Sequence, residues 1–410
     1  MARDDGGARA GGGLTAAGAA KADPTRIDEL LHRRTEANER FFAAEAERVA
    51  TLCREMAERF WDGHRLIAFG ASGQARSDAR HVAVEFVHPV IVGKRALPAI
   101  GLAPEGGPLA AQVEMVAESG DMAIAFGAEE GSAEVAAALE VAHERGCLTI
   151  AFAPIGAAWD FDPPTADPFV RQELAETLYH VLWELVHVFF EHLGGSEAGA
   201  GASSFLYPFL DRRSGDLASV VEDVARSVEA KAHEIGELRA QTLDDGREPL
   251  AAAAAALRAA FDQGGRVLAF GNGGSATDAM DAVADFQEAP QGWPSRAALD
   301  LTADTAILTA LANDIGPAVL FQRQIIAYGR QGDVALAFST SGNSVNIIEA
   351  LVEARKRGMG TIAMVGYDGG RVLAEGLADH IIVTRSEHIP RIQEAQASAY
   401  HVLRELVEAG

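Results

Sequence analysis

The sequence is poor in cysteine and in positive charge. Its only cysteines, Cys53 and Cys147, have neither metal-binding nor redox spacing, so we expect two buried packing residues, no disulfide framework and a reducing compartment. Lysine and arginine number 35 against 59 acidic residues, and the formal charge of −24 repels phosphate backbones and anionic lipids. The composition therefore argues against a nucleic-acid partner and against a membrane partner.

Long apolar runs are also missing. No stretch approaches the roughly 18 uninterrupted apolar residues of a membrane span, and residues 1–22 are rich in glycine and alanine without the apolar centre of a signal peptide. We therefore expect a cytoplasmic protein whose residues 1–24 form a flexible tail.

The chain is nevertheless well supplied with core-forming residues. Hydrophobic residues make up 48% of its 410 residues, which suits compact α/β packing, and the length predicts two or three domains.

Most of the chain is an internal repeat. The run LIAFG ending at Gly70 matches VLAFG ending at Gly271, and three later pairs follow in the same order. These pairs are SGDMAIAFG (119–127) with QGDVALAFS (331–339), AALEVAHERGCLTIAF (137–152) with EALVEARKRGMGTIAM (349–364), and YHVLWELV (179–186) with YHVLRELV (400–407). The offset drifts from 201 to 221, as loop insertions in a duplicated domain would produce.

The repeat divides the chain into two copies. We predict one domain over residues 25–193, a glycine- and serine-rich linker over 194–216 and a second domain over 217–410. Each copy opens with helix-forming sequence, at 27–60 and 217–261, and continues with short apolar runs that alternate with helical patterns. This order indicates a doubly wound parallel sheet, which binds ligands at the carboxyl ends of its strands.

Two loops of the second copy have the composition of an anion site. Residues 271–275 (GNGGS) join a predicted strand to a helix, and clustered glycines let backbone N–H groups approach an anion. Residues 339–344 (STSGNS) follow the next core strand and carry four hydroxyls, although a helix cap needs only one. The surplus favours a ligand with several acceptor oxygens, most simply a phosphate.

Four motifs of the second copy together resemble the sugar isomerase (SIS) family, in particular the phosphoheptose isomerases. They are GNGGSATDAM, ALANDIG (310–316), STSGNS and RIQEAQASAYHVL (391–403). The resemblance implies a five-stranded parallel sheet between helices in each copy, isomerisation of sedoheptulose 7-phosphate, frequent use of zinc and no nucleotide cofactor. It also implies a set of substrate-binding residues: Asn272, Gly273, Gly274, Ser275, Asp314, Ser339, Thr340, Ser341, Ser344 and Gln393.

The family's metal and acid/base group survives in the first copy. His81 and Glu85 lie one helical turn apart on one face, and Gln172 and His180 complete the four ligand types, so the resemblance implies a metal site there. The phosphate loops of this copy are lost, because GNGGS has become GASGQ and STSGNS has become GAEEGS, with Glu129 and Glu130. Two carboxylates oppose a phosphate dianion.

The second copy has the opposite losses. Gln393 and His401 remain, but the family's histidine and glutamate have become Asp281 and Asp285. Since sites in this family lie at subunit interfaces, we hypothesise that the second copy binds phosphate while the first contributes His81, Glu85 or His180. The candidate catalytic residues are His401 and Asp285, with Glu85 and His180 from the first copy.

Two functions stay open from the sequence. An aldose–ketose isomerase moves a proton between neighbouring carbons with a carboxylate base and a histidine acid. The altered Asp281 and Asp285 equally suit a regulatory protein that binds a phosphosugar without turnover, and Ala289, where the family has a substrate arginine, leaves the sugar open. The family's tetrameric habit implies a homo-oligomer in which two tandem chains form a pseudo-tetramer.

Overall fold

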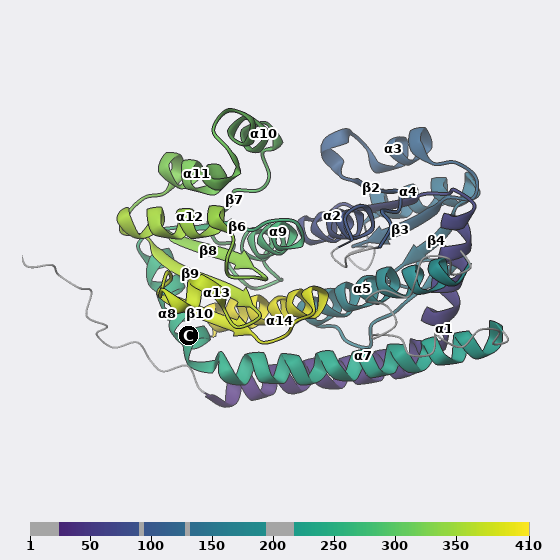
Figure 1. The fold of residues 1–410 in the computed structure, drawn as a ribbon, viewed down its shortest axis with the longest axis horizontal. Coiled ribbons are helices and arrows are strands. Elements are labelled where there is room, and N and C mark those ends of the chain that lie inside the picture. The colour runs from purple at the N-terminus through teal and green to yellow at the C-terminus, as the bar shows by residue number, and fades with distance from the viewer. Residues whose placement is uncertain (1–23, 90–93, 128–131, 194–216, 410) are drawn as a thin grey trace, which may run out of the picture.

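The computed structural model describes residues 24–89, 94–127, 132–193 and 217–409. The predicted linker, the tail up to residue 23, and Glu129 and Glu130 lie outside these ranges, so the predicted domain boundaries stay a prediction. The described residues form two parallel sheets of five strands each, with helices on both faces (Figure 1). The predicted α/β fold class is confirmed.

The first half contains the sheet β2-β1-β3-β4-β5. Its main elements are α1 (Pro24–Trp61), β1 (Leu66–Gly70), α2 (Gly73–Val87), β2 (Ala99–Leu102), α3 (Leu109–Val116), β3 (Met122–Phe126), α4 (Ala133–Glu144), β4 (Leu148–Ala151), β5 (Trp159–Asp160) and α5 (Pro168–Leu193).

The second half repeats this order in the sheet β7-β6-β8-β9-β10. Its main elements are α7 (Leu217–Asp245), α8 (Arg247–Asp262), β6 (Val267–Phe270), α9 (Gly274–Gln287), β7 (Ala298–Asp300), α10 (Thr305–Asp314), α11 (Leu320–Tyr328), β8 (Val334–Ser339), α12 (Val345–Lys356), β9 (Gly360–Gly366), α13 (Gly370–Ala374), β10 (His380–Thr384) and α14 (Ile389–Glu408). The helix expected over 217–261 is two helices that meet at Gly246.

The glycine that ends the first core run of each half permits a tight turn. A Cβ on Gly271 would lie 1.9 Å from the carbonyl oxygen of Ser275, and one on Gly70 would lie 2.4 Å from that of Ala75. The first turn of the following helix therefore lies directly against each glycine. Any side chain larger than hydrogen would push the strand end and the helix apart. The turn places the start of the helix at the carboxyl edge of the sheet.

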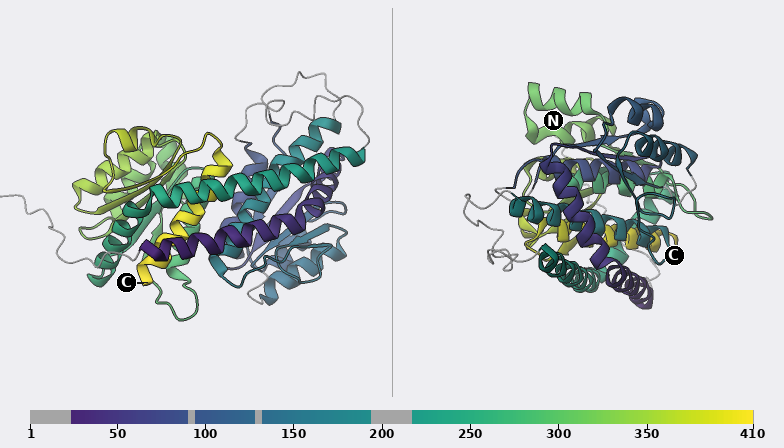
Figure 2. Two further views of the ribbon diagram at one scale, coloured as in Figure 1. Left: turned by 90° about the horizontal axis from the view of Figure 1, so that it is seen from below. Right: turned by 90° about the vertical axis from the view of Figure 1, so that its right-hand side faces the viewer.

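The long helices α1 and α7 tie the halves together. They run side by side beneath both sheets, and Figure 2 shows them crossing the boundary between the halves. Ile27 and Leu30 of α1 pack in the core of the second half, whereas Val224 and Val228 of α7 pack in the core of the first. Each half therefore buries part of the other's leading helix.

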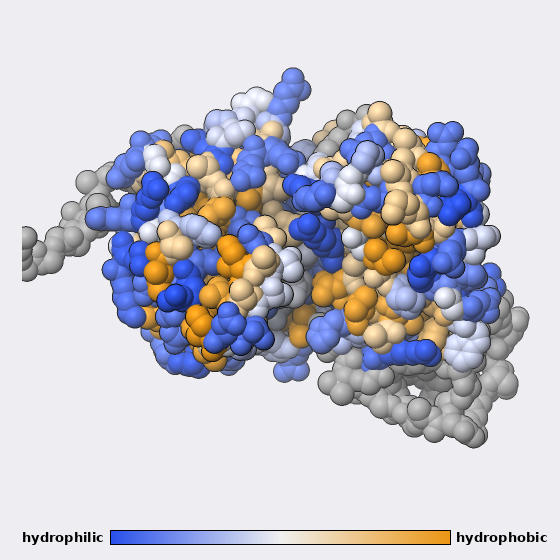
Figure 3. Space-filling model, turned by 90° about the horizontal axis from the view of Figure 1, so that it is seen from above, coloured by the Kyte–Doolittle hydropathy of each residue, from blue (hydrophilic) through white to orange (hydrophobic). Residues whose placement is uncertain are grey.

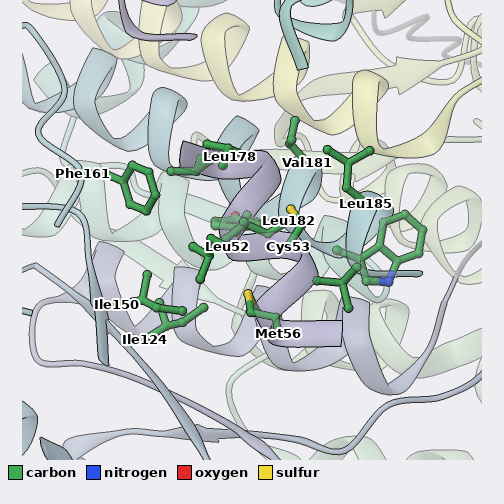
Figure 4. Packing of buried hydrophobic residues seen from close by; sticks show 14 of the residues in the cluster. Leu52, Cys53, Met56, Ile124, Ile150, Phe161, Leu178, Val181, Leu182 and Leu185 are labelled. Atoms are coloured by element: carbon green, nitrogen blue, oxygen red, sulfur yellow. The ribbon is translucent and has the colours of Figure 1, made fainter. Parts of the chain in front are cut away.

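The core of the first half lies between its sheet and the helix pair α1 and α5. Leu52, Cys53 and Met56 of α1 face Leu182 of α5 and Ile124 of β3 (Figure 4). Cys53 and Cys147 are both buried and unpaired, which confirms the expected packing role. Within the described ranges, no helix combines the length and apolarity that a membrane crossing needs.

Candidate active site

Four helices bring the predicted site residues together where the two halves meet. Helix α2 packs against α9, and α5 packs against α14. His81 and Glu85 lie on α2, His180 on α5 and His401 on α14, and all four side chains are buried. The candidate residues of both copies therefore face one another across a shared interior.

The first group forms around His81. The Nε2 atoms of His81 and His180 lie 3.3 Å apart, and the Tyr179 hydroxyl lies 2.9 Å from His81 Nδ1. Glu176 completes a group whose ligand atoms all lie within 4.8 Å of one another, and both of its carboxylate oxygens are buried without a hydrogen-bond partner. Glu85 is not part of this group, although its Oε1 atom lies 3.8 Å from His81 Nε2.

The amide that contacts His81 comes from the other half. Gln393 Nε2 lies 3.1 Å from His81 Nε2, whereas Gln172 donates its hydrogen bond to Asp78, at 3.1 Å. The side chains of Gln393 and His81 both lie close to the GNGGS loop. A Cβ on Gly274 would lie 2.0 Å from Gln393 Nε2 and 3.0 Å from His81 Nε2. The histidine of the first half thus lies against the GNGGS loop of the second.

The second group forms around His401. Its Nε2 atom lies 3.3 Å from Asp285 Oδ2 and 3.6 Å from Asp281 Oδ2. The Tyr400 hydroxyl donates to Asp281, at 2.5 Å, and Gln74 of the first half donates to Asp285 Oδ1, at 2.7 Å. This group also meets the spacing for a metal ion.

Each group is completed by a glutamate from the opposite half. His401 Nδ1 lies 2.9 Å from Glu173 Oε1 on α5, and His180 Nδ1 lies 3.0 Å from Glu394 Oε1 on α14. Arg34 of α1 donates from Nε to Glu173 at 2.9 Å, whereas Arg391 of α14 donates from Nη1 to Glu394 on the same helix. Each histidine is therefore held by a glutamate of the opposite half, and that glutamate is also contacted by an arginine.

Burial and these charges set the protonation states. Burial raises the pKa of Asp285 to about 7, and it raises that of Glu85 to about 7. Burial opposes the charge on His401, but Asp285, Asp281 and Glu173 together raise its pKa to about 10. The pKa of His81 lies well below its ordinary value because of burial and the neighbouring His180. An imidazolium next to a carboxylate that titrates near neutral pH is an acid/base pair.

The two halves differ in whether a side chain caps the N-terminus of the helix that follows each loop. In the first half, Ser72 and Ser132 cap α2 and α4 by accepting N–H bonds from Ala75 and Val135. Within the described ranges, the N-cap residues of the corresponding helices α9 and α12, Gly273 and Ser344, make no side-chain cap bond, and in α12 only Ile347 N donates to a side chain, that of Asn346. Uncapped N–H groups at a helix start are donors for an anion.

The STSGNS loop keeps its hydroxyl hydrogens available. Ser339 Oγ accepts from Gly342 N at 3.1 Å, and Ser341 Oγ accepts from Asn343 N at 3.2 Å, so each O–H can still donate to a ligand. Ser341 and Asn343 line an open cavity of about 710 Å³, together with Tyr367, Asp368 and residues 385–387.

The other predicted substrate residues differ in burial and in their contacts. Ser275 and Ser339 are buried, whereas Thr340 and Ser341 are half-buried. Asn272 is exposed and forms a reciprocal amide pair with Asn346. Asp314 lies at the exposed end of α10, where its carboxylate accepts from Asn313.

Sequence reasoning missed four residues of this site. Glu173 and Glu394 follow the predicted glutamines directly, so the repeated Gln-Glu dipeptide was a signal that could have been read. Glu176 and Gln74 have no counterpart of their own type in the second half, and no sequence signal identified them.

Comparisons with known proteins identify the family. A family model for the SIS domain matches residues 232–366. The phosphoheptose isomerase of Pelodictyon phaeoclathratiforme is 45% identical over 152 residues, which cover 36% of this chain and 71% of that protein. The chain belongs to the phosphoheptose isomerase family. A second member, from Chlorobium phaeobacteroides, is 39% identical over 204 residues, covering 48% of this chain and 85% of that protein.

Solved structures also match this SIS-family chain across both halves. The C-terminal domain of glucosamine-fructose-6-phosphate aminotransferase from Francisella tularensis has a TM-score of 0.60 at 11% identity, covering 94% of this chain and 95% of that one. Tagatose-6-phosphate ketose/aldose isomerase from Escherichia coli has a TM-score of 0.55 at 12% identity, covering 96% of each chain. At these identities the likeness shows the fold, which is a tandem of two SIS-type sheets.

The His81 group fits the zinc ion that the family often uses. Two imidazoles and a carboxylate are a common zinc donor set, and the buried oxygens of Glu176 have no hydrogen-bond partner to give up. The second group carries two carboxylates and a histidine that is already charged at neutral pH, which suits a metal less well.

Proposed function

We propose that this chain interconverts the ketose and aldose forms of a sugar phosphate, with sedoheptulose 7-phosphate as the substrate. One observation carries the proposal: the second half has two helix starts without an N-cap side-chain bond, at its GNGGS and STSGNS loops, and His81 of the first half lies against the GNGGS loop. This supports a ligand that is bound by groups from both halves.

The phosphate is held by the second half. The uncapped start of α12 and the hydroxyls of Ser339, Thr340, Ser341 and Ser344 supply the donors, because a phosphate dianion accepts several hydrogen bonds. The first half has lost these groups, and its own serines already satisfy the corresponding helix starts.

Asp285 and His401 carry the proton transfer. The Asp285 carboxylate takes the proton from the carbon beside the carbonyl while His401 protonates the carbonyl oxygen, which gives an enediol. Returning the proton to the neighbouring carbon, with loss of the other hydroxyl proton, completes the isomerisation. Glu85 and His180 are the corresponding pair of the first half, next to His81.

A zinc ion would be held by His81, Glu176 and His180, with Glu85 close by. When bound, it would supply a Lewis acid for the polarised carbonyl. Gln393 orients His81 from the other half, so neither half contains the complete arrangement by itself.

NMR of sedoheptulose 7-phosphate with the purified chain tests the activity. We expect aldose signals to appear and His401→Ala to abolish them, because the mutation removes the acid. His233→Ala is the matched control, since His233 is an exposed histidine of α7 and should leave turnover unchanged.

A second function, phosphosugar binding without turnover, is favoured by the burial of the acid/base pair. Asp285 is 1% exposed and His401 is 0% exposed, so a substrate reaches them only if the surrounding helices open. Saturable binding of sedoheptulose 7-phosphate without any aldose signal would establish this function instead.

The assembly that we infer is supported by exposed hydrophobic side chains, and the location by the cysteines. We infer that two chains pair through the face that carries α3 and α10, where both halves expose hydrophobic side chains (Figure 3). Met115 on α3 is 82% exposed and Ile315 after α10 is 57% exposed. The two buried, unpaired cysteines support a cytoplasmic location.

A further inference from the structure

The first half retains a cavity at the carboxyl ends of its strands. It has a volume of about 620 Å³, within the range of small-molecule sites, and it opens beside the ends of β1, β3 and β4. Phe126 and Phe152, whose rings stack with centroids 4.9 Å apart, form part of its apolar wall. This half therefore lost its phosphate loops without losing its pocket.

The described wall does not suit a phosphate. The hydroxyl of Ser72 caps α2, and the terminal nitrogens of Arg171 donate to Asp162 and to main-chain carbonyls. Asp78 also lines the cavity, and its carboxylate opposes an anion, whereas Asp162 is paired with Arg171 at 3.3 Å. A neutral or cationic ligand fits these walls better.

The same wall contains a carboxylate beside an amide. Gln172 and Asp78 both line the cavity, and Gln172 Nε2 donates to Asp78 Oδ1 at 3.1 Å. An amine or hydroxyl of a ligand would donate to this carboxylate. Apolar walls with a few convergent acceptors accept the ring of a monosaccharide and its hydroxyls.

The cavity is linked to the acid/base pair of the second half through one side chain. Gln74 lines the cavity and donates from Nε2 to Asp285 Oδ1, at 2.7 Å. The other oxygen of that carboxylate lies 3.3 Å from His401 Nε2. A ligand that engages Gln74 would change how Asp285 is held.

We propose that this cavity binds a monosaccharide-sized ligand that carries amine or hydroxyl donors and no phosphate, and that its occupancy regulates the site of the second half through Gln74. The first half is then a sensor of an unphosphorylated amino sugar. The binding stands apart from the proposed isomerase activity, whereas the regulatory effect rests on it.

Calorimetry on the full chain tests the binding, with glucosamine and unphosphorylated sedoheptulose as probes. We expect glucosamine to bind saturably, and Asp78→Asn to weaken it at least tenfold because a charge-assisted hydrogen bond is lost. Ala166→Trp, at an exposed position of the cavity rim, should block binding without disturbing the core. Ser341→Ala, in the phosphate loop of the other half, should leave glucosamine binding unchanged.

The regulatory effect of the cavity on the second half is measured by adding glucosamine to the turnover assay. We expect kcat for sedoheptulose 7-phosphate to change at least threefold in the unaltered chain and to stay constant in Ala166→Trp. If the chain has no isomerase activity, the affinity for sedoheptulose 7-phosphate measured with and without glucosamine reports the same coupling.

Three results would overturn the proposal. Absence of saturable binding by both probes would remove the site, and loss of binding in Ser341→Ala but not in Asp78→Asn or Ala166→Trp would place it in the second half. Binding that changes neither turnover nor affinity for the sugar phosphate would remove the regulatory role.

Discussion

Glu173 is the residue of the first half that holds His401, the proposed acid of the second half. Its carboxylate is 1% exposed, and it accepts hydrogen bonds from Arg34 at 2.9 Å and from Ser398 at 2.5 Å, and pairs with His401 at 2.9 Å. Burial opposes its charge, but Arg34 and His401 lower the pKa of Glu173 to about 2. Glu173→Gln keeps the shape and removes the charge.

We expect Glu173→Gln to cost both stability and activity. Breaking a buried ion pair costs about 3–5 kcal/mol, and the lower value applies here because Arg34 retains Glu405, at 2.9 Å. Without the carboxylate at Nδ1, the imidazolium of His401 loses a stabilising charge and its fixed orientation, so kcat should fall about a hundredfold. Urea unfolding measures the stability, and NMR turnover measures kcat.

Glu394→Gln is the matched control, because Glu394 holds His180 by the same geometry in the first half. We expect a similar loss of stability and an about 10–100-fold loss of zinc affinity, with kcat restored at saturating zinc. If both variants lose kcat equally at saturating zinc, or if Glu173→Gln keeps the original kcat, the assignment of proton transfer to His401 is refuted.

Three further predictions follow from the same geometry. The rate should rise with pH near 7 as Asp285 loses its proton and should fall near pH 10 as His401 loses its own, which a pH–rate profile checks; a flat profile would contradict the pair. Ser341→Ala should weaken sedoheptulose 7-phosphate binding about 10–100-fold in calorimetry, because it removes one donor to a dianion, and unchanged affinity would place the phosphate elsewhere. Gly274→Ala should destabilise the chain by about 1–3 kcal/mol and lower kcat, since the added carbon would displace the amide and imidazole packed on it. Gly236→Ala, in the helix α7 with open space around it, should instead be neutral or stabilising in the same denaturation assay, and equal losses in both variants would show that the contact at Gly274 is not responsible.

The two sheets could be predicted because their signals are local. Apolar runs that alternate with helical patterns identify buried parallel strands, and the repeat indicated that one domain occurs twice. The turn at Gly271 was also readable, since a glycine cluster between strand and helix has few other uses. The break at Gly246 was not, because a single glycine does not by itself end a helix.

The sequence by itself determined the duplication, the parallel fold and the different losses in the two copies, because these are written in residues that are close together along the chain. Only the tertiary structure decided which residues form a site. Glu173 and His401 are 228 positions apart, and His81 and Gln393 are 312 apart, yet each pair is in contact. The reason is the packing of α5 on α14 and of α2 on α9, which buries polar faces that must be satisfied from the opposite half.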